Sequence, residues 1–279
     1  MAATLFTPDD GGQHSGIVMC QGAVGTMQFF GFPDIARRFA ELGHAVLIFD
    51  HRGFGGSEGE RGRTFALEQV QDIRDAMSFL QSQPEVDPER IALFGTSIGG
   101  GSAVYASAID SRARWTISAV GFGDGERMVR AGRDGTAWQE FLAEIKEDRQ
   151  ERVVTGRSQL IPRSRIAQRD ERSLEVRARV IGGNPGAEAA VPDLTLESAE
   201  RLIEFRPVRM AGLIAPRSVL FISAEEDQVT PADGIEAMFA AAGEPKAYEC
   251  LPGIGHYEVY EEPHVSRLIA LTHDWINAS

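Results

Sequence analysis

The chain has 279 residues, a length that suits one large α/β domain with an insertion. Its formal net charge of −13 argues against binding to nucleic acid or anionic membranes, because both require clustered positive charge. Cys20 and Cys250 lie far apart in separate apolar runs, and the N-terminus lacks the basic and apolar regions of a signal peptide. We therefore expect free thiols, a cytoplasmic protein without a membrane span, and neither a cofactor nor a metal ion.

Short apolar runs predict buried β-strands at residues 16–20, 45–49, 91–94, 115–120, 217–223 and 247–251. Apolar residues at helical spacing and turn signals predict helices between them, at residues 33–42, 64–81, 231–242 and 264–276, and a small-residue helix directly after residue 97. Strands that alternate with helices form a parallel sheet covered on both faces. The expected fold class is therefore α/β, with a mostly parallel, doubly wound sheet.

The alternation of strands and helices stops between residues 122 and 207. This stretch contains charged helical segments at residues 138–152 and 194–205, and no apolar run like those before it. We interpret residues 122–207 as a helical cap inserted into a core formed by residues 1–121 and 208–279. A peripheral decoration of the surface is the alternative interpretation.

Ser97 lies in the pattern Gly-Thr-Ser-Ile-Gly, between a short apolar strand and a helix of small residues. This context is typical of a nucleophile elbow, whose sharp turn requires small residues two positions away on either side, here Gly95 and Gly99. The same five-residue pattern surrounds Ser57, but that serine lies in a polar glycine-rich loop with no helix start behind it. Ser97 is therefore the predicted nucleophile.

A serine hydroxyl needs a base to remove its proton, usually a histidine that a carboxylate orients. Among the six histidines, His256 is favoured because its glycine-rich loop follows a predicted strand. The turn after the preceding strand offers three acids, and Asp227 is favoured over Glu225 and Glu226 because a short aspartate in that turn can point inward. The sequence therefore predicts a triad of Ser97, Asp227 and His256.

Two backbone N–H groups are expected to form the oxyanion hole. Ile98 follows the nucleophile at the start of a helix, and Ala23 lies in the loop after the first predicted strand. Cys20 ends that strand and has no obvious histidine partner, so we interpret it as a structural thiol rather than as a nucleophile.

A cap inserted at this point of the chain should cover the carboxyl ends of the strands, where ligands bind in such sheets. We therefore predict that its apolar side chains shape the substrate pocket, namely Phe122, Met128, Trp138, Phe141 and Leu142. The alternative for Trp138 and Phe141 is that they anchor the cap to the core.

The motifs at residues 50–57 and 84–97, together with Asp227 and His256, resemble the α/β-hydrolase superfamily over nearly the whole chain, specifically its dienelactone-hydrolase-like and prolyl-dipeptidyl-peptidase-like esterases. In that family the first loop usually reads His-Gly, whereas this chain has Gln21 before its glycine, and the family's N-terminal strands look truncated or absent here. Haloalkane dehalogenases and epoxide hydrolases resemble this fold but carry aspartate at the elbow. A serine there points to acyl transfer.

Together these residues predict a serine hydrolase that cleaves a carboxylic ester, thioester, lactone or amide of a small molecule through an acyl-serine intermediate. An acyltransferase, a cyclase or a carbon–carbon bond hydrolase could use the same triad and stays an alternative. The intact triad argues against a non-catalytic ligand receptor. The expected partner is a small-molecule acyl substrate, and the oligomeric state is left open, a homodimer included.

Overall fold

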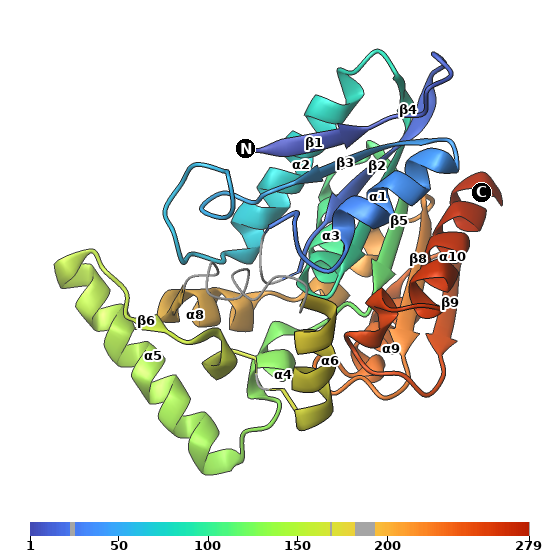
Figure 1. The fold of residues 1–279 in the computed structure, drawn as a ribbon. Helices are drawn as coiled ribbons and strands as arrows, with labels where there is room; N and C mark the ends of the chain where they lie inside the picture. The colour runs from blue at the N-terminus through green and yellow to red at the C-terminus, as the bar shows by residue number, and fades with distance from the viewer. Residues whose placement is uncertain (23–25, 168, 182–192, 279) are drawn as a thin grey trace.

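The computed structural model describes residues 1–22, 26–167, 169–181 and 193–278. Its centre is a seven-stranded sheet in the order β1-β3-β2-β4-β5-β8-β9 (Figure 1). Neighbouring strands run parallel except β1, which is antiparallel to β3. The strands are β1 Ala3–Phe6, β2 His14–Cys20, β3 His44–Phe49, β4 Val86–Thr96, β5 Ala113–Ala119, β8 Ser218–Ala224 and β9 Lys246–Leu251. The predicted mostly parallel α/β fold is confirmed.

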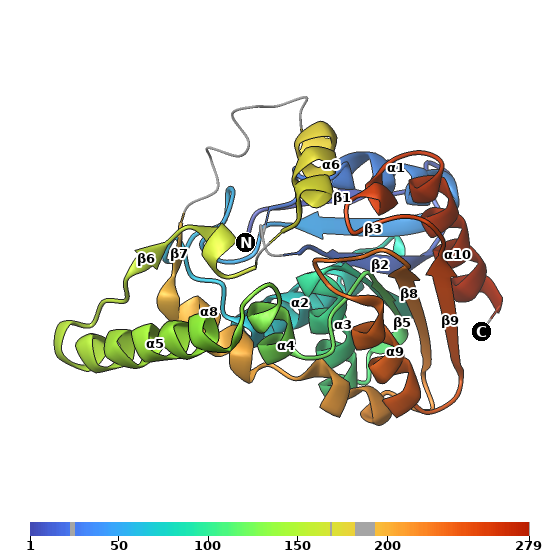
Figure 2. The ribbon, with the colours of Figure 1, turned by 90° about the horizontal axis from the view of Figure 1, so that it is seen from below.

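Helices cover both faces of the sheet (Figure 2). Because side chains alternate along a strand, β3 directs Val46 and Ile48 to one face and Leu47 and Phe49 to the other, and all four are buried. Burial on both faces explains why the strands read as continuous apolar runs. One face carries α1 (Phe32–Glu41) and α10 (His264–Ala278), and the other carries α2 (Ala66–Gln81), α3 (Ile98–Ile109) and α9 (Ala232–Ala241).

The N-terminal segment forms a strand that the sequence analysis missed. In β1, Ala3 lies opposite Phe49 of β3. Ser57 holds this edge, because its hydroxyl accepts a hydrogen bond from the Ala2 N–H at 2.8 Å and donates one to the Asp50 carbonyl oxygen at 2.6 Å. A strand of four residues, none of them fully buried, carries too little pattern to be recognised.

In the described residues between β5 and β8, four α-helices lie beyond the carboxyl ends of the parallel strands (Figures 1 and 2), and we call these helices the cap. They are α4 (Gly125–Arg130), α5 (Gly135–Thr155), α6 (Glu171–Ile181) and α8 (Leu196–Glu204). Two short strands, β6 (Leu160–Ile161) and β7 (Leu194–Thr195), pair antiparallel beside them, and at two residues each they are too short for a sequence signal.

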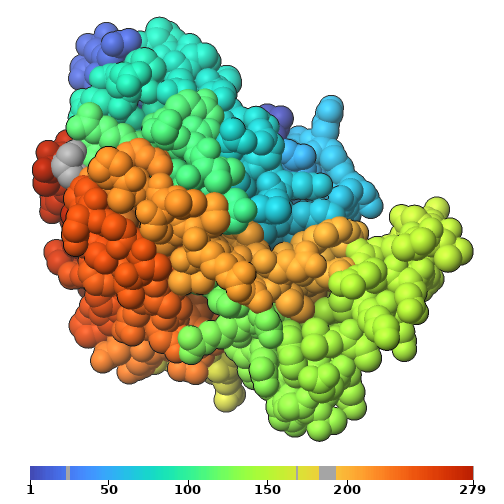
Figure 3. All heavy atoms as spheres, turned by 180° about the vertical axis from the view of Figure 1, so that it is seen from behind, coloured from blue at the N-terminus to red at the C-terminus, as the bar shows by residue number. Residues whose placement is uncertain are grey.

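α5 stands out from the body of the molecule (Figure 3). Asp134 begins it as N-cap, accepting a hydrogen bond from the Ala137 N–H at 2.8 Å, and Gly156 ends it with a φ of 70°. Within the described ranges, no helix is long and apolar enough to cross a membrane. The exact boundaries of the cap domain, at residues 122 and 207, stay a prediction.

Candidate active site

Ser97 lies at the turn between β4 and α3. Its backbone angles, φ 56° and ψ −126°, fall in a region that is unfavourable for a residue with a Cβ atom, so the turn is strained. Close contacts explain the flanking glycines. A Cβ on Gly95 would lie 2.2 Å from the Gly99 carbonyl oxygen, and a Cβ on Gly99 would lie 2.1 Å from the Cys20 carbonyl oxygen. The strand, turn and helix therefore present the hydroxyl as a nucleophile elbow does.

A line of hydrogen bonds connects Ser97 to His256 and His256 to Asp227. His256 Nε2 lies 3.0 Å from Ser97 Oγ, and His256 Nδ1 lies 2.7 Å from Asp227 Oδ2. His256 and Asp227 are 2% and 3% exposed, whereas Glu225 and Glu226 are exposed to solvent. In this arrangement Nδ1 donates to the carboxylate, and Nε2 is left to accept the serine proton. The fold thus brings together the three residues that the sequence singled out.

Thr230 is part of this site and was missed by sequence reasoning. Its Oγ1 donates to the Val120 carbonyl oxygen at 2.7 Å, and lies 2.9 Å from Asp227 Oδ2 and 3.0 Å from His256 Nδ1. Asp227 Oδ1 also accepts the backbone N–H groups of Val229 and Thr230, at 2.8 and 2.7 Å. These bonds fix the carboxylate that orients the imidazole. An aspartate that bonds the backbone two and three residues on is a turn signal, and it could have drawn attention to Thr230.

The two predicted oxyanion donors fall differently in the structure. Ile98 is the first residue of α3, so its N–H has no acceptor within the helix, and it lines the same cavity as Ser97. Ala23 lies outside the described residues. Gly22, directly before it, lies against Ser97, since a Cβ there would lie 3.1 Å from Ser97 Cβ.

A small cavity, with room of about 30 Å³, opens beside Ser97 and His256. One wall is aromatic, because the Phe30 ring stacks on Tyr257 and Tyr260 at centroid distances of 5.6 and 4.9 Å. Burial raises the pKa of the Tyr260 phenol, which therefore stays neutral. The other lining residues come from the core and the cap: Gly22, Ile98, Met128, Ala167, Arg169, Arg177 and Val229.

The comparison with known families follows from this geometry. The family model described as serine aminopeptidase, S33 matches residues 13–263, a span that includes Ser97, Asp227 and His256. The chain belongs to the S33 family. The predicted membership of the α/β-hydrolase superfamily is thereby confirmed. The chain belongs to a family of hydrolases. The narrower dienelactone-hydrolase-like branch stays a prediction.

Relatives of this S33-family chain align with it over most of its length. It is 30% identical over 277 residues to an uncharacterized 31.7 kDa protein from the traX-finO intergenic region of Escherichia coli, covering 99% of this chain and 94% of that protein. It is 28% identical over 239 residues to a thiohydrolase of Eupenicillium brefeldianum, covering 81% and 74%. The crystal structure of the α/β hydrolase GrgF from Penicillium sp. sh18 has the same fold, with a TM-score of 0.78, 22% identity and coverage of 99% and 98%.

Gln21 occupies the position where the resemblance leads one to expect histidine. Its Nε2 donates to the Phe49 carbonyl oxygen, so the side chain ties the loop after β2 to the end of β3. Burial raises the pKa of the neighbouring Cys20 thiol, which disfavours the thiolate that a nucleophile requires. Ser57 is engaged by backbone groups, as described above. Among the described residues of this S33-family chain, no three His, Cys, Asp or Glu side chains gather as a metal site would require.

Of the predicted pocket residues, Met128 lines the cavity beside Ser97. Phe122 is buried and packs near the end of α8. Trp138 and Phe141 lie side by side in α5, with ring centroids 6.5 Å apart, and Leu142 packs at the edge of the same core cluster. These four side chains lie outside the lining of that cavity. The contacts of Trp138 and Phe141 favour the anchoring alternative.

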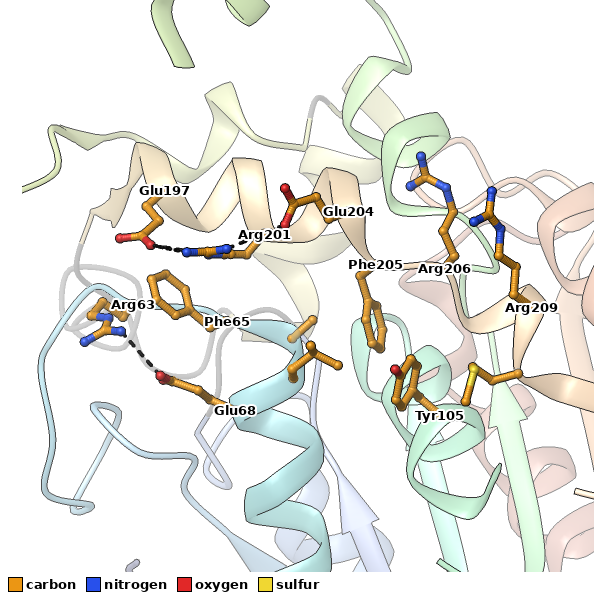
Figure 4. A pocket seen from close by; sticks show the side chains of 13 residues that line it. Arg63, Phe65, Glu68, Tyr105, Glu197, Arg201, Glu204, Phe205, Arg206 and Arg209 are labelled. Atoms are coloured by element: carbon orange, nitrogen blue, oxygen red, sulfur yellow. Dashed lines mark hydrogen bonds and ion pairs between the residues drawn. The ribbon is translucent and has the colours of Figure 1, made fainter. Parts of the chain in front are cut away.

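A larger hollow lies elsewhere on the molecule. Figure 4 shows this groove, of about 550 Å³, between the start of α2 and α8. The guanidinium groups of Arg63 and Arg201 lie 4.2 and 5.8 Å from the centroid of the Phe65 ring, and Tyr105 stacks on Phe205 at 5.1 Å. None of the three candidate triad residues lines this groove, so size alone would misplace the site.

Proposed function

We propose that the protein is a serine hydrolase that cleaves an ester, thioester, lactone or amide of a small carboxylic acid through an acyl-serine intermediate. The observation that carries the proposal is the unbroken hydrogen-bonded line from Ser97 through His256 to Asp227. This arrangement removes the hydroxyl proton during attack, which a serine needs to act as a nucleophile near neutral pH. Among these bonds we favour the thioester, because the Eupenicillium relative is named a thiohydrolase.

In the first half-reaction, Ser97 Oγ attacks the acyl carbon while its proton passes to His256 Nε2. The Asp227 carboxylate stabilises the imidazolium that forms. The Ile98 N–H, at the positive end of α3, donates to the oxyanion of the tetrahedral intermediate. Nε2 then gives the proton to the leaving sulfur, oxygen or nitrogen, the bond to the acyl carbon breaks, and the acyl group stays on Ser97.

In the second half-reaction, water gives a proton to His256 Nε2 and attacks the acyl carbon. The tetrahedral intermediate collapses, the carboxylic acid leaves, and the proton returns to Ser97 Oγ. The cavity of about 30 Å³ leaves room for few water molecules beside the acyl-serine. A relative from Stachybotrys chlorohalonatus, named a polyketide transferase, supports a second candidate function, acyl transfer to a substrate hydroxyl, amine or thiol in place of water.

A fluorophosphonate probe tests the proposal. The wild-type protein should be labelled at Ser97, and Ser97→Ala should lose the label and slow the cleavage of thioesters and esters by roughly 10⁴-fold or more. Product analysis with a competing alcohol separates hydrolysis from transfer. A folded protein that takes no label and cleaves nothing in a screen of thioesters, esters, lactones and amides would contradict the proposal and favour a ligand receptor.

A further inference from the structure

Arg169, a cap residue just before α6, faces the cavity beside Ser97. The same side chain lines a second small cavity, of about 20 Å³, and the two cavities share Ile98, Met128 and Ala167 as well as Arg169. Arg169 also lines an outer groove between α5 and α6, of about 590 Å³. Its guanidinium therefore stands where the enclosed space next to the nucleophile meets the outer groove.

The guanidinium of Arg169 is oriented, and no carboxylate of the described residues lies within ion-pair distance of it. Its Nε donates to Tyr257 Oη at 2.7 Å, and Tyr257 itself is buried directly after His256. Five other arginines between β5 and β8 differ, because each pairs with a glutamate: Arg149, Arg152, Arg165, Arg172 and Arg179. A half-buried positive charge that the fold leaves uncompensated is costly unless a ligand supplies the anion.

We propose that Arg169 binds a carboxylate on the acyl part of the substrate, so that the preferred substrates are half-esters or half-thioesters of short dicarboxylic acids. This inference rests on the proposed function. The Nη groups of Arg169 can form the paired hydrogen bonds that a planar carboxylate accepts. The apolar lining from Met128, Ala167 and Val229 suits the methylene groups of a short chain.

Two methyl esters with acyl chains of equal length test the inference: methyl hydrogen glutarate and methyl pentanoate. The glutarate chain ends in a carboxylate, and the pentanoate chain ends in a methyl group. We expect the wild-type protein to prefer the glutarate half-ester. Arg169→Met should lower kcat/KM for that half-ester by about 10- to 100-fold and leave pentanoate nearly unchanged. Arg169→Lys keeps the charge without the planar fork and should lose less. Arg157→Met makes the same change at an exposed arginine just after α5 and should leave both substrates unaffected.

Equal losses for both esters in Arg169→Met, together with lower thermal stability, would overturn the inference and make Arg169 an anchor for Tyr257. A binding measurement that needs no catalysis separates a failure of this inference from a failure of the proposed function. Calorimetry should detect binding of methyl hydrogen glutarate to Ser97→Ala and a loss of binding in the double variant with Arg169→Met. If the probe labels Ser97 and esters are cleaved, but Arg169→Met has no effect, the proposed hydrolase function stands and the carboxylate site is refuted.

Discussion

The sheet core and the cap are stabilised in different ways. The central strands bury apolar side chains on both faces, and the candidate triad lies in turns at the ends of three of these strands. In the cap, α5 and α8 are joined by ion pairs, because Glu200 pairs with both Arg149 and Arg152, and Arg152 also pairs with Glu197. Salt weakens partly exposed ion pairs and affects apolar packing much less. The candidate triad thus stands on apolar packing, whereas the cap adds ion pairs to the apolar contacts that Trp138, Phe141 and Ile145 make.

α6 shows what this difference means for the site. Arg172 pairs with Glu226 and Glu258, and Arg179 pairs with Glu261, so ion pairs bind this helix to the turns that carry Asp227 and His256. Because α6 contributes to the cavity lining, changes in charge should alter the cavity without moving the triad. Four predictions test this separation, in order of decreasing effect.

The largest effect is expected in the core, at Asp227. Asp227→Asn keeps an oxygen that can accept the backbone N–H groups of Val229 and Thr230, but it then presents an N–H group to His256 Nδ1. Nδ1 has to accept this hydrogen bond, so the ring proton lies on Nε2. The unfavourable tautomer should lower kcat by roughly 10⁴-fold. The cavity lining should be unchanged, so Kd for a substrate-like acid should stay near the wild-type value. A comparable loss in Glu226→Gln would contradict the choice of acid.

In the cap, Glu200→Gln should release the clamp between α5 and α8. Glu200 is 6% exposed and Arg152 is nearly buried, although Arg149 is half exposed, so we expect a loss of about 2 kcal/mol in the stability of this region. Hydrogen exchange of α5 measures it. Glu204→Gln, at an exposed carboxylate 3.6 Å from Arg201, is the matched control and should change exchange little. Equal effects of Glu200→Gln and Glu204→Gln on exchange would show that Glu200 stabilises the cap no more than an exposed carboxylate does.

The core should respond to pH at His44, at the start of β3. Burial lowers the pKa of His44 to about 4, and the charges of His273, Arg90 and His14 lower it further in the same direction. The unfolded chain therefore binds this proton more readily than the folded chain, so stability is complete above pH 6.5 and falls as the pH drops toward 4.

Between pH 7 and pH 4.5 this histidine should remove about 2 kcal/mol from the free energy of unfolding. Urea denaturation at both pH values measures the loss, and His44→Gln should show a shallower decrease over the same interval. Parallel pH profiles of the two proteins would exclude His44 as the source.

The smallest effect is expected at Ser57, which shares its five-residue pattern with the nucleophile. Ser57→Ala removes the bonds to the Ala2 N–H and to the Asp50 carbonyl oxygen, and should cost about 1 kcal/mol of stability at the edge of the sheet. Labelling at Ser97 and turnover should stay at wild-type levels. Inactivation of a well-folded Ser57→Ala protein would show that the wrong serine was chosen.

Most of the core could be predicted from the sequence, because its signals are local. Each central strand is a short apolar run, and Gly95 and Gly99 mark the strained turn around Ser97. The candidate acid and base were found in the same way, since each follows a predicted strand in a turn. The edge strand β1 and the pair β6 and β7 were missed because two to four residues carry no period.

The sequence by itself determined the type of fold, and it singled out the candidate serine, acid and base in their order along the chain. Only the tertiary structure decided which side chains surround them. Phe30 and Arg169 have no distinctive local pattern, and they reach the cavity beside Ser97 through contacts between segments far apart in the chain. Met128 faces the cavity while Trp138 and Phe141 do not, because the rotation of each helix is set by packing and ion pairs that no single segment encodes.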